Sequence, residues 1–212
     1  MANEIDDEVF MPVENYLKDT ESAIKLFFEG LDSYFSMKLP SLEAYIDESG
    51  FVQMSRSEAG EFLKPYEKYF ALEFSRATLA GSILQVAYMA LKKFSSNSEV
   101  SQKCQEFGVV ANSDLSRYCV GREVHGIPIG LLIYVGRIQY NHWEDGHLKK
   151  VPTGVFDHLA NVYHDDQDFD MVYALHYPEP HPVSHYIVRF ELGWITFDDY
   201  IKDMRMMLVS KE

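Results

Sequence analysis

Residues 66–94 read YEKYFALEFSRATLAGSILQVAYMALKKF, and this stretch decides the fold. Its apolar side chains are spread around most of a helix circumference, at Phe70, Leu72, Phe74, Ala77, Leu79, Ala80, Ile83, Leu84, Ala87 and Leu91. A helix without a polar face is buried on all sides and lies at the centre of a protein. Its most apolar part, residues 77–91, is shorter than the about 20 residues that a membrane-spanning helix needs. We therefore expect a central buried helix and no membrane segment.

The residues before this stretch predict a long amphipathic helix followed by a connection. Across residues 12–37, apolar side chains recur mostly at spacings of three, four or seven, as on one face of a helix. Pro40 ends this helix because proline disfavours helical geometry in the residue before it. Residues 41–54 hold at most a short helix. Ser55 or Ser57 then caps a long helical stretch.

The residues after the central stretch predict a series of shorter helices. These helices are expected over residues 128–148, 153–163 and 182–193, and from Thr196 onward. Prolines suit the first turns of the first and third, and Thr153 and Thr196 suit the caps of the other two. Strands are nearly absent from this prediction because period-2 alternation is weak.

Together these elements predict an all-α fold, a helical bundle with two long central helices and several shorter flanking helices. Residues 1–10 are expected to form an acidic flexible tail, and residues 11–212 a single all-α domain. Residues 95–113 are rich in Ser and Asn and are the best candidate for a linker within that domain. One short helix is expected there, around Cys104.

The composition is that of an ordinary globular protein. Of 212 residues, 47% are hydrophobic and 25% charged, which excludes wholesale disorder. With 19 basic and 33 acidic residues the net charge is −14, which argues against broad nucleic-acid binding through a basic surface. The two cysteines, Cys104 and Cys119, are too few for a disulfide framework or a cysteine-based zinc site. The acidic N-terminus is not a signal peptide, so we expect a cytoplasmic protein with reduced thiols.

The histidines are concentrated in one part of the chain, since all eight lie within residues 125–185. No His-Glu-x-x-His pattern occurs among them. His164 is followed by two aspartates, and His181 and His185 would share a helix face only if the helix already includes His181. A metal site in residues 158–185 therefore stays a minor alternative, and no cofactor is expected.

The strongest functional feature is the sequence YVGRIQYNHWED, which begins at Tyr134. Tyr134, Arg137 and Asn141 follow helical spacings of three and four, so they form a polar stripe on one face. Arg137 carries a permanent charge and a planar donor fork suited to phosphate, and His142 titrates near neutral pH. Together they are the smallest set of side chains that could cleave a phosphodiester without a metal ion. The histidine transfers the proton, and the arginine stabilises the negative charge that develops on the phosphate. Tyr134, Tyr140 and Asn141 would position the substrate.

The Arg-x4-His spacing of Arg137 and His142, on a late helix of an all-α chain, resembles the HEPN superfamily, the higher eukaryote and prokaryote nucleotide-binding domain. The surrounding Tyr-x-x-Arg-x-Gln-Tyr-Asn-His-Trp resembles the motif region of some bacterial members, and the C-terminal LGWITFDDYIKDM is similar more weakly. The resemblance implies a helical bundle that dimerises through the motif helix. It also implies a metal-independent endoribonuclease, in which Arg and His from both protomers line one cleft.

A second interpretation stays open because the chain departs from the motif. Active members of the superfamily commonly carry Asn, Asp or His directly after the arginine, where this chain has Ile138. In this interpretation Arg137 bonds to Glu144 or Asp145 within a structural network. The chain is then a non-catalytic interaction or ligand-binding protein, of the kind found in toxin–antitoxin or defence systems. The cationic side chains that could also contribute to a local basic pocket are Arg122, Lys149 and Lys150. The expected partners are a second copy of the chain and RNA or a nucleotide.

Overall fold

The computed structural model describes residues 12–35, 40–47, 49–145, 147–164, 172–175 and 181–208, and these are predominantly helical. The α-helices are α1 (Val13–Phe35), α2 (Arg56–Ala71), α3 (Glu73–Phe94), α4 (Gln102–Glu106), α5 (Ile129–His142), α6 (Lys150–Val162), α7 (Ser184–Tyr186) and α8 (Phe197–Leu208). Short 3-10 turns are η1 (Leu42–Tyr45), η2 (Ser116–Tyr118) and η3 (Trp143–Asp145), and η4 (Ile187–Glu191) is a π-helical turn. Strands β1 (Glu123–Val124) and β2 (Ile127–Pro128) form an antiparallel hairpin. The predicted all-α bundle is confirmed.

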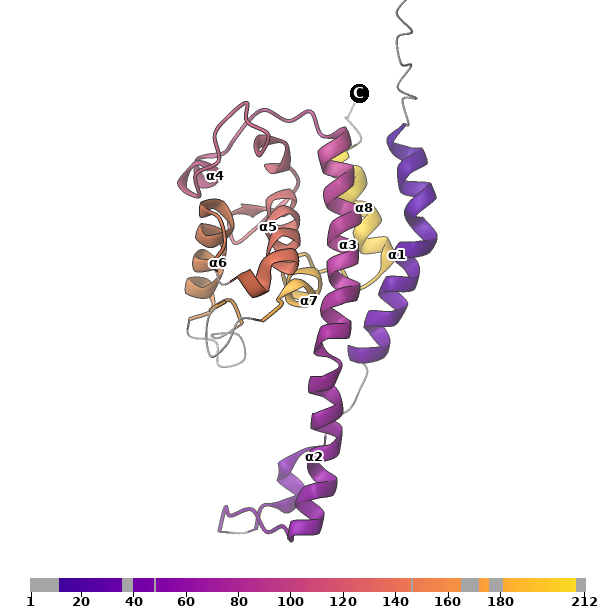
Figure 1. Cartoon of the computed structure of the whole chain (residues 1–212), viewed down its shortest axis with the longest axis vertical. Coiled ribbons are helices and arrows are strands. Elements are labelled where there is room, and N and C mark those ends of the chain that lie inside the picture. The colour runs from indigo at the N-terminus through magenta and orange to yellow at the C-terminus, as the bar shows by residue number, and fades with distance from the viewer. Residues whose placement is uncertain are drawn as a thin grey trace, which may run out of the picture.

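Helix α3 is the centre of the bundle, with α1 packed along one side and α5 along another (Figure 1). Its broad buried face includes Ala80, Leu84 and Ala87, none of which is accessible to solvent. The opposite face stays open, since the side chains of Phe74 and Met89 are 59% and 43% exposed. The prediction of a central helix is therefore confirmed, but its burial on all sides is wrong because this second face is only partly covered by the described residues.

Two glycines let α3 and α5 approach each other closely. A side-chain carbon added at Gly81 of α3 would lie 2.5 Å from the ring of Tyr140 on α5. One added at Gly136 of α5 would lie 3.0 Å from Leu84 of α3 and 3.1 Å from Ile187 of η4. Real carbon atoms do not approach as closely as 2.5 Å, so Gly81 is required to keep the present helix spacing. At Gly136 the added carbon would fit only tightly, and Leu84 and Ile187 would have to shift by a few tenths of an ångström.

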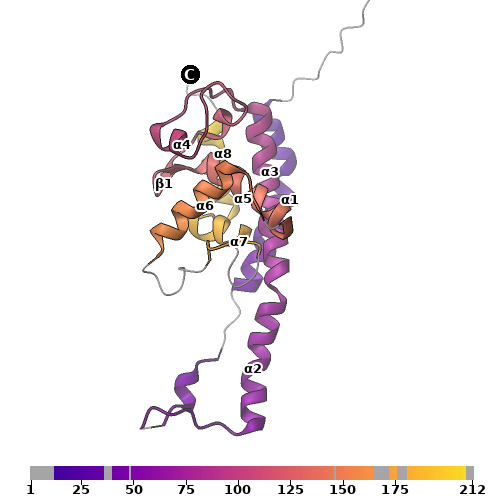
Figure 2. The ribbon, with the colours of Figure 1, turned by 60° about the vertical axis from the view of Figure 1, so that its left-hand side comes forward.

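Helix α2 and η1 form an arm that extends away from the rest of the bundle, as both ribbon views show (Figures 1 and 2). Ser55 caps α2 as predicted, because its hydroxyl accepts the backbone N–H of Glu58 while the Glu58 carboxylate accepts the N–H of Ser55. The arm has a small aromatic cluster of its own, in which the ring of Phe62 contacts those of Tyr45 and Tyr66.

Some predicted helix boundaries differ from those observed. The long helical stretch after Ser55 is interrupted at Leu72, so α2 and α3 are separate helices, and Pro65 lies inside α2. Helix α5 ends at His142 rather than near residue 148, and η3 continues the chain for one further turn.

Two later helices also begin at other residues than predicted. Thr153 does not cap α6 but lies within its first turn, since its hydroxyl donates to the carbonyls of Leu148 and Lys149. The helix expected from Pro182 begins at Ser184 and passes directly into η4.

The segment 95–113, considered above as a linker, packs against the bundle. It contains the short helix α4, which includes Cys104 as predicted. The amide of Asn97 donates to the carbonyl of Ser116, and the Ser116 hydroxyl donates back to the carbonyl of Asn97. Side chains of this segment that lie in the core are Cys104, Phe107 and Val109.

A buried carboxylate attaches the C-terminal helix α8. Asp203 accepts two hydrogen bonds from Arg122, at 3.2 and 2.9 Å, and one from Trp194 Nε1 at 2.8 Å. Arg122, a candidate for the basic pocket, is therefore occupied in holding the hairpin region to α8. Thr196 and Asp199 cap this helix as predicted, each side chain accepting the backbone N–H of the other.

Two predicted features lie outside the described residues, namely the acidic tail at 1–10 and the aspartates that follow His164. Within the described part of the chain, no helix combines the length and the apolar character needed to cross a membrane. The second long helix of the predicted bundle is α1, which runs beside α3 in both views (Figures 1 and 2).

Replacing Gly81 with alanine should lower the free energy of unfolding by about 1–3 kcal/mol, because the new methyl group overlaps the ring of Tyr140. Urea denaturation followed by circular dichroism measures this change. The matched control is Gly60→Ala in α2, where no atom lies within 4 Å of the added carbon. That control should be neutral or stabilise by up to about 1 kcal/mol. Equal effects of the two substitutions would show that the α3–α5 contact is not tight.

Candidate functional site

Helix α5 carries all of the predicted site residues, and the β1–β2 hairpin sets where it begins. The hairpin turn is formed by His125 and Gly126, which both have positive φ, at 52° and 76°. Two such residues build the tight turn whose twist matches that of paired strands. Residues 129–133 of α5 are buried, and the polar residues of the helix follow from Tyr134 onward.

Arg137 points towards α3 rather than towards the end of its own helix. Its Nε donates to Gln85 Oε1 at 2.8 Å, and its guanidinium carbon lies 4.8 Å from the ring centre of Tyr88. A guanidinium at this distance from an aromatic ring is held by a cation–π interaction. The prediction that Arg137 bonds to Glu144 or Asp145 is therefore wrong. Arg137 is part of an internal network, but its partners are Gln85 and Tyr88.

Tyr134 belongs to a cluster of three tyrosines beside Arg137. Its ring centre lies 4.9 Å from that of Tyr118, and Tyr118 in turn stacks on Tyr88 at 5.4 Å. Burial, and to a lesser extent the neighbouring Tyr88, raise the pKa of Tyr134, so its hydroxyl stays protonated at neutral pH. The cluster packs α5, α3 and η2 together beside the guanidinium group of Arg137.

His142 lies at the last residue of α5, and its Nδ1 is 2.7 Å from Asp145 Oδ2. Both side chains are about half exposed, at 49% and 56%. A carboxylate beside one ring nitrogen orients the imidazole and selects its tautomer. The pair opens into a cavity of about 270 Å³ that is also lined by Tyr134, Ile138, His147, Leu148 and Lys149.

The other two predicted residues have local roles. The amide of Asn141 donates to the carbonyl of Arg137 one turn earlier, at 3.1 Å. The ring of Tyr140 lies against Gly81 of α3. The structure therefore brings Tyr134 and His142 to one cavity, while Arg137, Tyr140 and Asn141 are not among the residues that line it.

Of the remaining candidate cations, only Lys149 lines this cavity. Lys150 begins α6 and extends beside Gly108. The cavity therefore combines one lysine and two histidines with the single carboxylate of Asp145, in a chain whose overall charge is −14.

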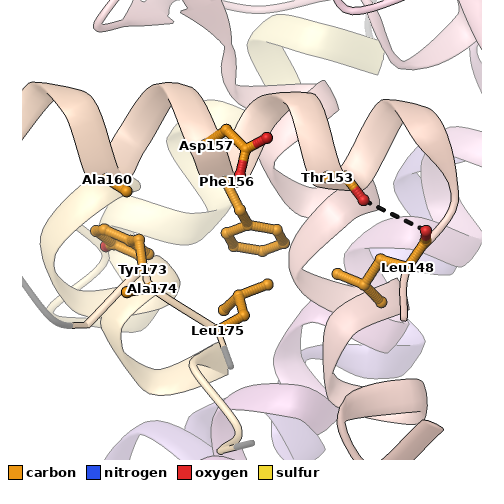
Figure 3. Close-up of a pocket in the computed structure, with 8 residues that line it drawn as sticks. All are labelled: Leu148, Thr153, Phe156, Asp157, Ala160, Tyr173, Ala174 and Leu175. Carbon is orange, nitrogen blue, oxygen red and sulfur yellow. Dashed lines mark hydrogen bonds between the residues drawn. The ribbon is translucent and has the colours of Figure 1, made fainter. Parts of the chain in front are cut away.

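A second cavity of about 370 Å³ shares Leu148 with the first (Figure 3). Its walls come from α6 and the described segment 172–175, with the rings of Phe156 and Tyr173 and the side chain of Leu175 facing one another (Figure 3). Asp157 is the charged residue of its lining. A mostly apolar cavity with few polar groups is typical of a small-molecule or base-binding site.

The structure places the candidate ligands His181 and His185 in different local settings. Nε2 of His181 lies 2.9 Å from the carbonyl of Val172, while His185 is buried in α7, whose first residue is Ser184. His181 is thus outside that helix. Among the described residues, no group of three or more His, Cys, Asp or Glu side chains is arranged to hold a metal ion.

The structure also reveals a buried acid that the sequence did not single out. Glu191, in η4, accepts the hydroxyl of Tyr173 at 2.6 Å, and its other oxygen lies 3.6 Å from Nε2 of His125. The same nitrogen lies 3.1 Å from the hydroxyl of Tyr163. No local pattern marks Glu191, because its partners Tyr173 and His125 come from two other segments of the chain, so only the tertiary structure could find it.

Comparison with protein-family models, curated proteins and solved structures finds no match for this chain. The resemblance to HEPN domains therefore rests on the motif around Arg137 and His142 and, more weakly, on the C-terminal sequence LGWITFDDYIKDM.

The burial of His185 makes stability depend on pH. Burial, followed by Arg76 and His181, lowers the pKa of His185 to about 3, whereas an unfolded chain has a value near 6.5. Below about pH 6.5 the unfolded state therefore binds a proton that the folded state does not, and stability falls as the pH drops. Between pH 7 and pH 5 this loss is about 2 kcal/mol.

Urea unfolding of the wild type and of His185→Gln at these two pH values checks this prediction. The wild type should lose about 2 kcal/mol more than the variant on acidification. Identical pH dependence in the two proteins would contradict it.

Proposed function

We propose that this chain is a HEPN-like ribonuclease that cleaves RNA without a metal ion, with His142 as the group that transfers the proton. The observation that carries the proposal is the 2.7 Å contact between His142 and Asp145 at the mouth of a cavity with Lys149. An oriented histidine beside a cation is suited to acid–base chemistry at a phosphodiester.

The chemistry follows from which nitrogen of His142 is engaged. With Nδ1–H donating to Asp145, Nε2 can accept the proton of a ribose 2′-hydroxyl. The 2′-oxygen then attacks the adjacent phosphorus, the bond to the 5′-oxygen breaks, and that oxygen takes up a proton. Lys149 stabilises the negative charge on the phosphate oxygens. The cavity beyond Leu148, with Phe156 and Tyr173 in its walls, suits the apolar face of a base.

Arg137 enters this chemistry through a second copy of the chain. On one helix, positions five apart point about 140° away from each other, so Arg137 and His142 of one chain cannot easily face the same phosphate. The guanidinium of Arg137 uses Nε for Gln85, which leaves its two terminal nitrogens to bind a phosphate. In the proposed dimer, Arg137 of one copy faces His142 of the other.

A partly exposed stripe on α3 supports a partner at this position. Phe74, Gln85 and Met89 lie on one side of α3, since they are separated by near-multiples of a helical turn. Gln85 of this stripe holds Arg137, and the ring of Phe74 contacts Trp143 of η3 at 5.7 Å. A second copy that covers the two exposed apolar side chains would therefore lie directly beside Arg137.

Removal of the proton-transfer group should lower RNA cleavage strongly. His142→Ala should reduce the cleavage rate by about 10²–10⁴-fold, and Asp145→Ala by less, because it only orients the ring. A fluorogenic RNA substrate in the presence of EDTA provides the measurement. Arg205→Ala is the matched surface control, because Arg205 is an exposed arginine of α8 paired with Glu14. Cleavage that is unchanged in His142→Ala would refute the proposal.

Mixing two inactive variants tests the shared site of the dimer. Arg137→Ala and His142→Ala should each be inactive alone. If every site takes Arg137 from one copy and His142 from the other, half of the dimers in an equal mixture contain one intact site. The mixture should then recover about a quarter of the wild-type activity. No recovery, with mixed dimers shown by native mass spectrometry, would place both residues in one chain's site.

The second candidate is a non-catalytic interaction protein, and the network around Arg137 favours it. Arg137 is held by Gln85 and Tyr88, as a structural arginine would be, and Ile138 supplies no polar group beside it. Under this alternative, Arg137→Ala should weaken self-association or lower stability while no variant changes RNA cleavage. The two candidates are therefore separated by the same set of variants.

A further inference from the structure

The cavity of about 370 Å³ between α6 and residues 172–175, here called the α6 cavity, adjoins the cavity at His142. A small hollow between them is lined by residues of both. Leu148 and Leu175 are its members from the α6 cavity, and His142 and His147 are its members from the other. A nucleotide whose phosphate lies at His142 can therefore place its base beside α6.

The shape of the α6 cavity suits a flat, mostly apolar ligand. Its volume falls within the range of about 300–1,000 Å³ that is usual for small-molecule sites. Leu148, Ala160 and Leu175 are partly exposed in its lining, and Phe156 and Tyr173 are almost completely buried behind them. The walls therefore offer apolar contact to the two faces of a ring but no charge.

The polar side chains of this lining offer acceptors rather than donors. Thr153 and Asp157 are four positions apart, so they lie along one face of α6 (Figure 3). An ionised carboxylate such as that of Asp157 only accepts hydrogen bonds. The hydroxyl of Thr153 donates to two backbone carbonyls of the preceding turn, and that of Tyr173 donates to Glu191 at 2.6 Å. A hydroxyl has one proton, so neither of these two has a donor left for a ligand.

We propose that the α6 cavity binds a guanine base and that Asp157 selects it. Guanine carries two adjacent donors on its Watson–Crick edge, the N1–H and the N2 amino group, which match the two oxygens of a carboxylate. Adenine and cytosine place an acceptor nitrogen beside their amino group, and uracil places a carbonyl on each side of its N3–H. A carboxylate repels these acceptors. This inference rests on the proposed ribonuclease function, because it names the base that the RNA substrate places in this cavity.

Titration with free nucleosides tests the base site without any cleavage step. In a two-dimensional NMR spectrum of the ¹⁵N-labelled full chain, guanosine should shift the amide signals of α6 and of residues 172–175. Adenosine, cytidine and uridine should bind at least about fivefold more weakly, which is the lower end of what a bidentate base contact discriminates. Nucleosides carry no phosphate, so this binding does not depend on His142 or Lys149.

The variant Asp157→Asn should change which base is preferred. Its amide presents one acceptor and one donor, the pair that matches adenine. Guanosine affinity should therefore fall by about 5–100-fold, and adenosine should bind at least as tightly as guanosine. A structural role for Asp157 would instead weaken all four nucleosides equally. The matched control is Asp19→Asn, an exposed position of α1 outside this lining, which should leave the affinities unchanged.

Filling the cavity provides a second variant. Ala160→Leu adds three carbon atoms at a partly exposed lining position, so guanosine binding should be lost while the circular dichroism spectrum stays that of the wild type. Guanosine that binds no more tightly than the other nucleosides would overturn the inference. So would signal shifts confined to other parts of the chain, or unchanged guanosine affinity in Asp157→Asn.

Cleavage of two RNA oligonucleotides, alike except that one contains a single guanosine, separates this inference from the proposed function. The wild type should cleave the guanosine-containing RNA at least about fivefold faster. Guanosine binding at α6 without cleavage of either RNA would refute the ribonuclease proposal and support the guanine site. Equal cleavage of both RNAs that is lost in His142→Ala would support the ribonuclease and refute the guanine site.

Discussion

The close approach of α3 and α5 is the constraint on which the rest of the structure depends. It exists because Gly81 and Gly136 present no side chain at the contact, so Tyr140 and Leu84 can fill the space instead. Close packing of this kind allows few alternative spacings, since added or removed atoms leave overlaps or voids. How closely the two helices approach decides which neighbours each side chain of α5 contacts.

That contact divides the predicted site between two faces of one helix. Arg137 is drawn towards α3, where Gln85 and Tyr88 hold it, while His142 emerges at the end of the helix beside Asp145. Because the two side chains leave the helix about 140° apart, they cannot easily face the same phosphate within one chain. The proposed composite site of two copies would use both residues without changing the fold.

Tyr118 of η2 connects the segment after α3 to this contact, because its ring contacts Tyr88 of α3 and Tyr134 of α5. The unusual buried acid, Glu191, lies on a different side, bonded to Tyr173.

The sequence by itself determined the helices, because apolar periodicity and capping residues such as Ser55 and Thr196 act locally. It also determined that Arg137 and His142 share one helix, since their spacing is short. Only the tertiary structure decided the partners: Gln85 for Arg137, Asp203 for Arg122, and Tyr173 for Glu191. These pairings join residues far apart in the chain, and they depend on how closely helices pack, which no local pattern encodes.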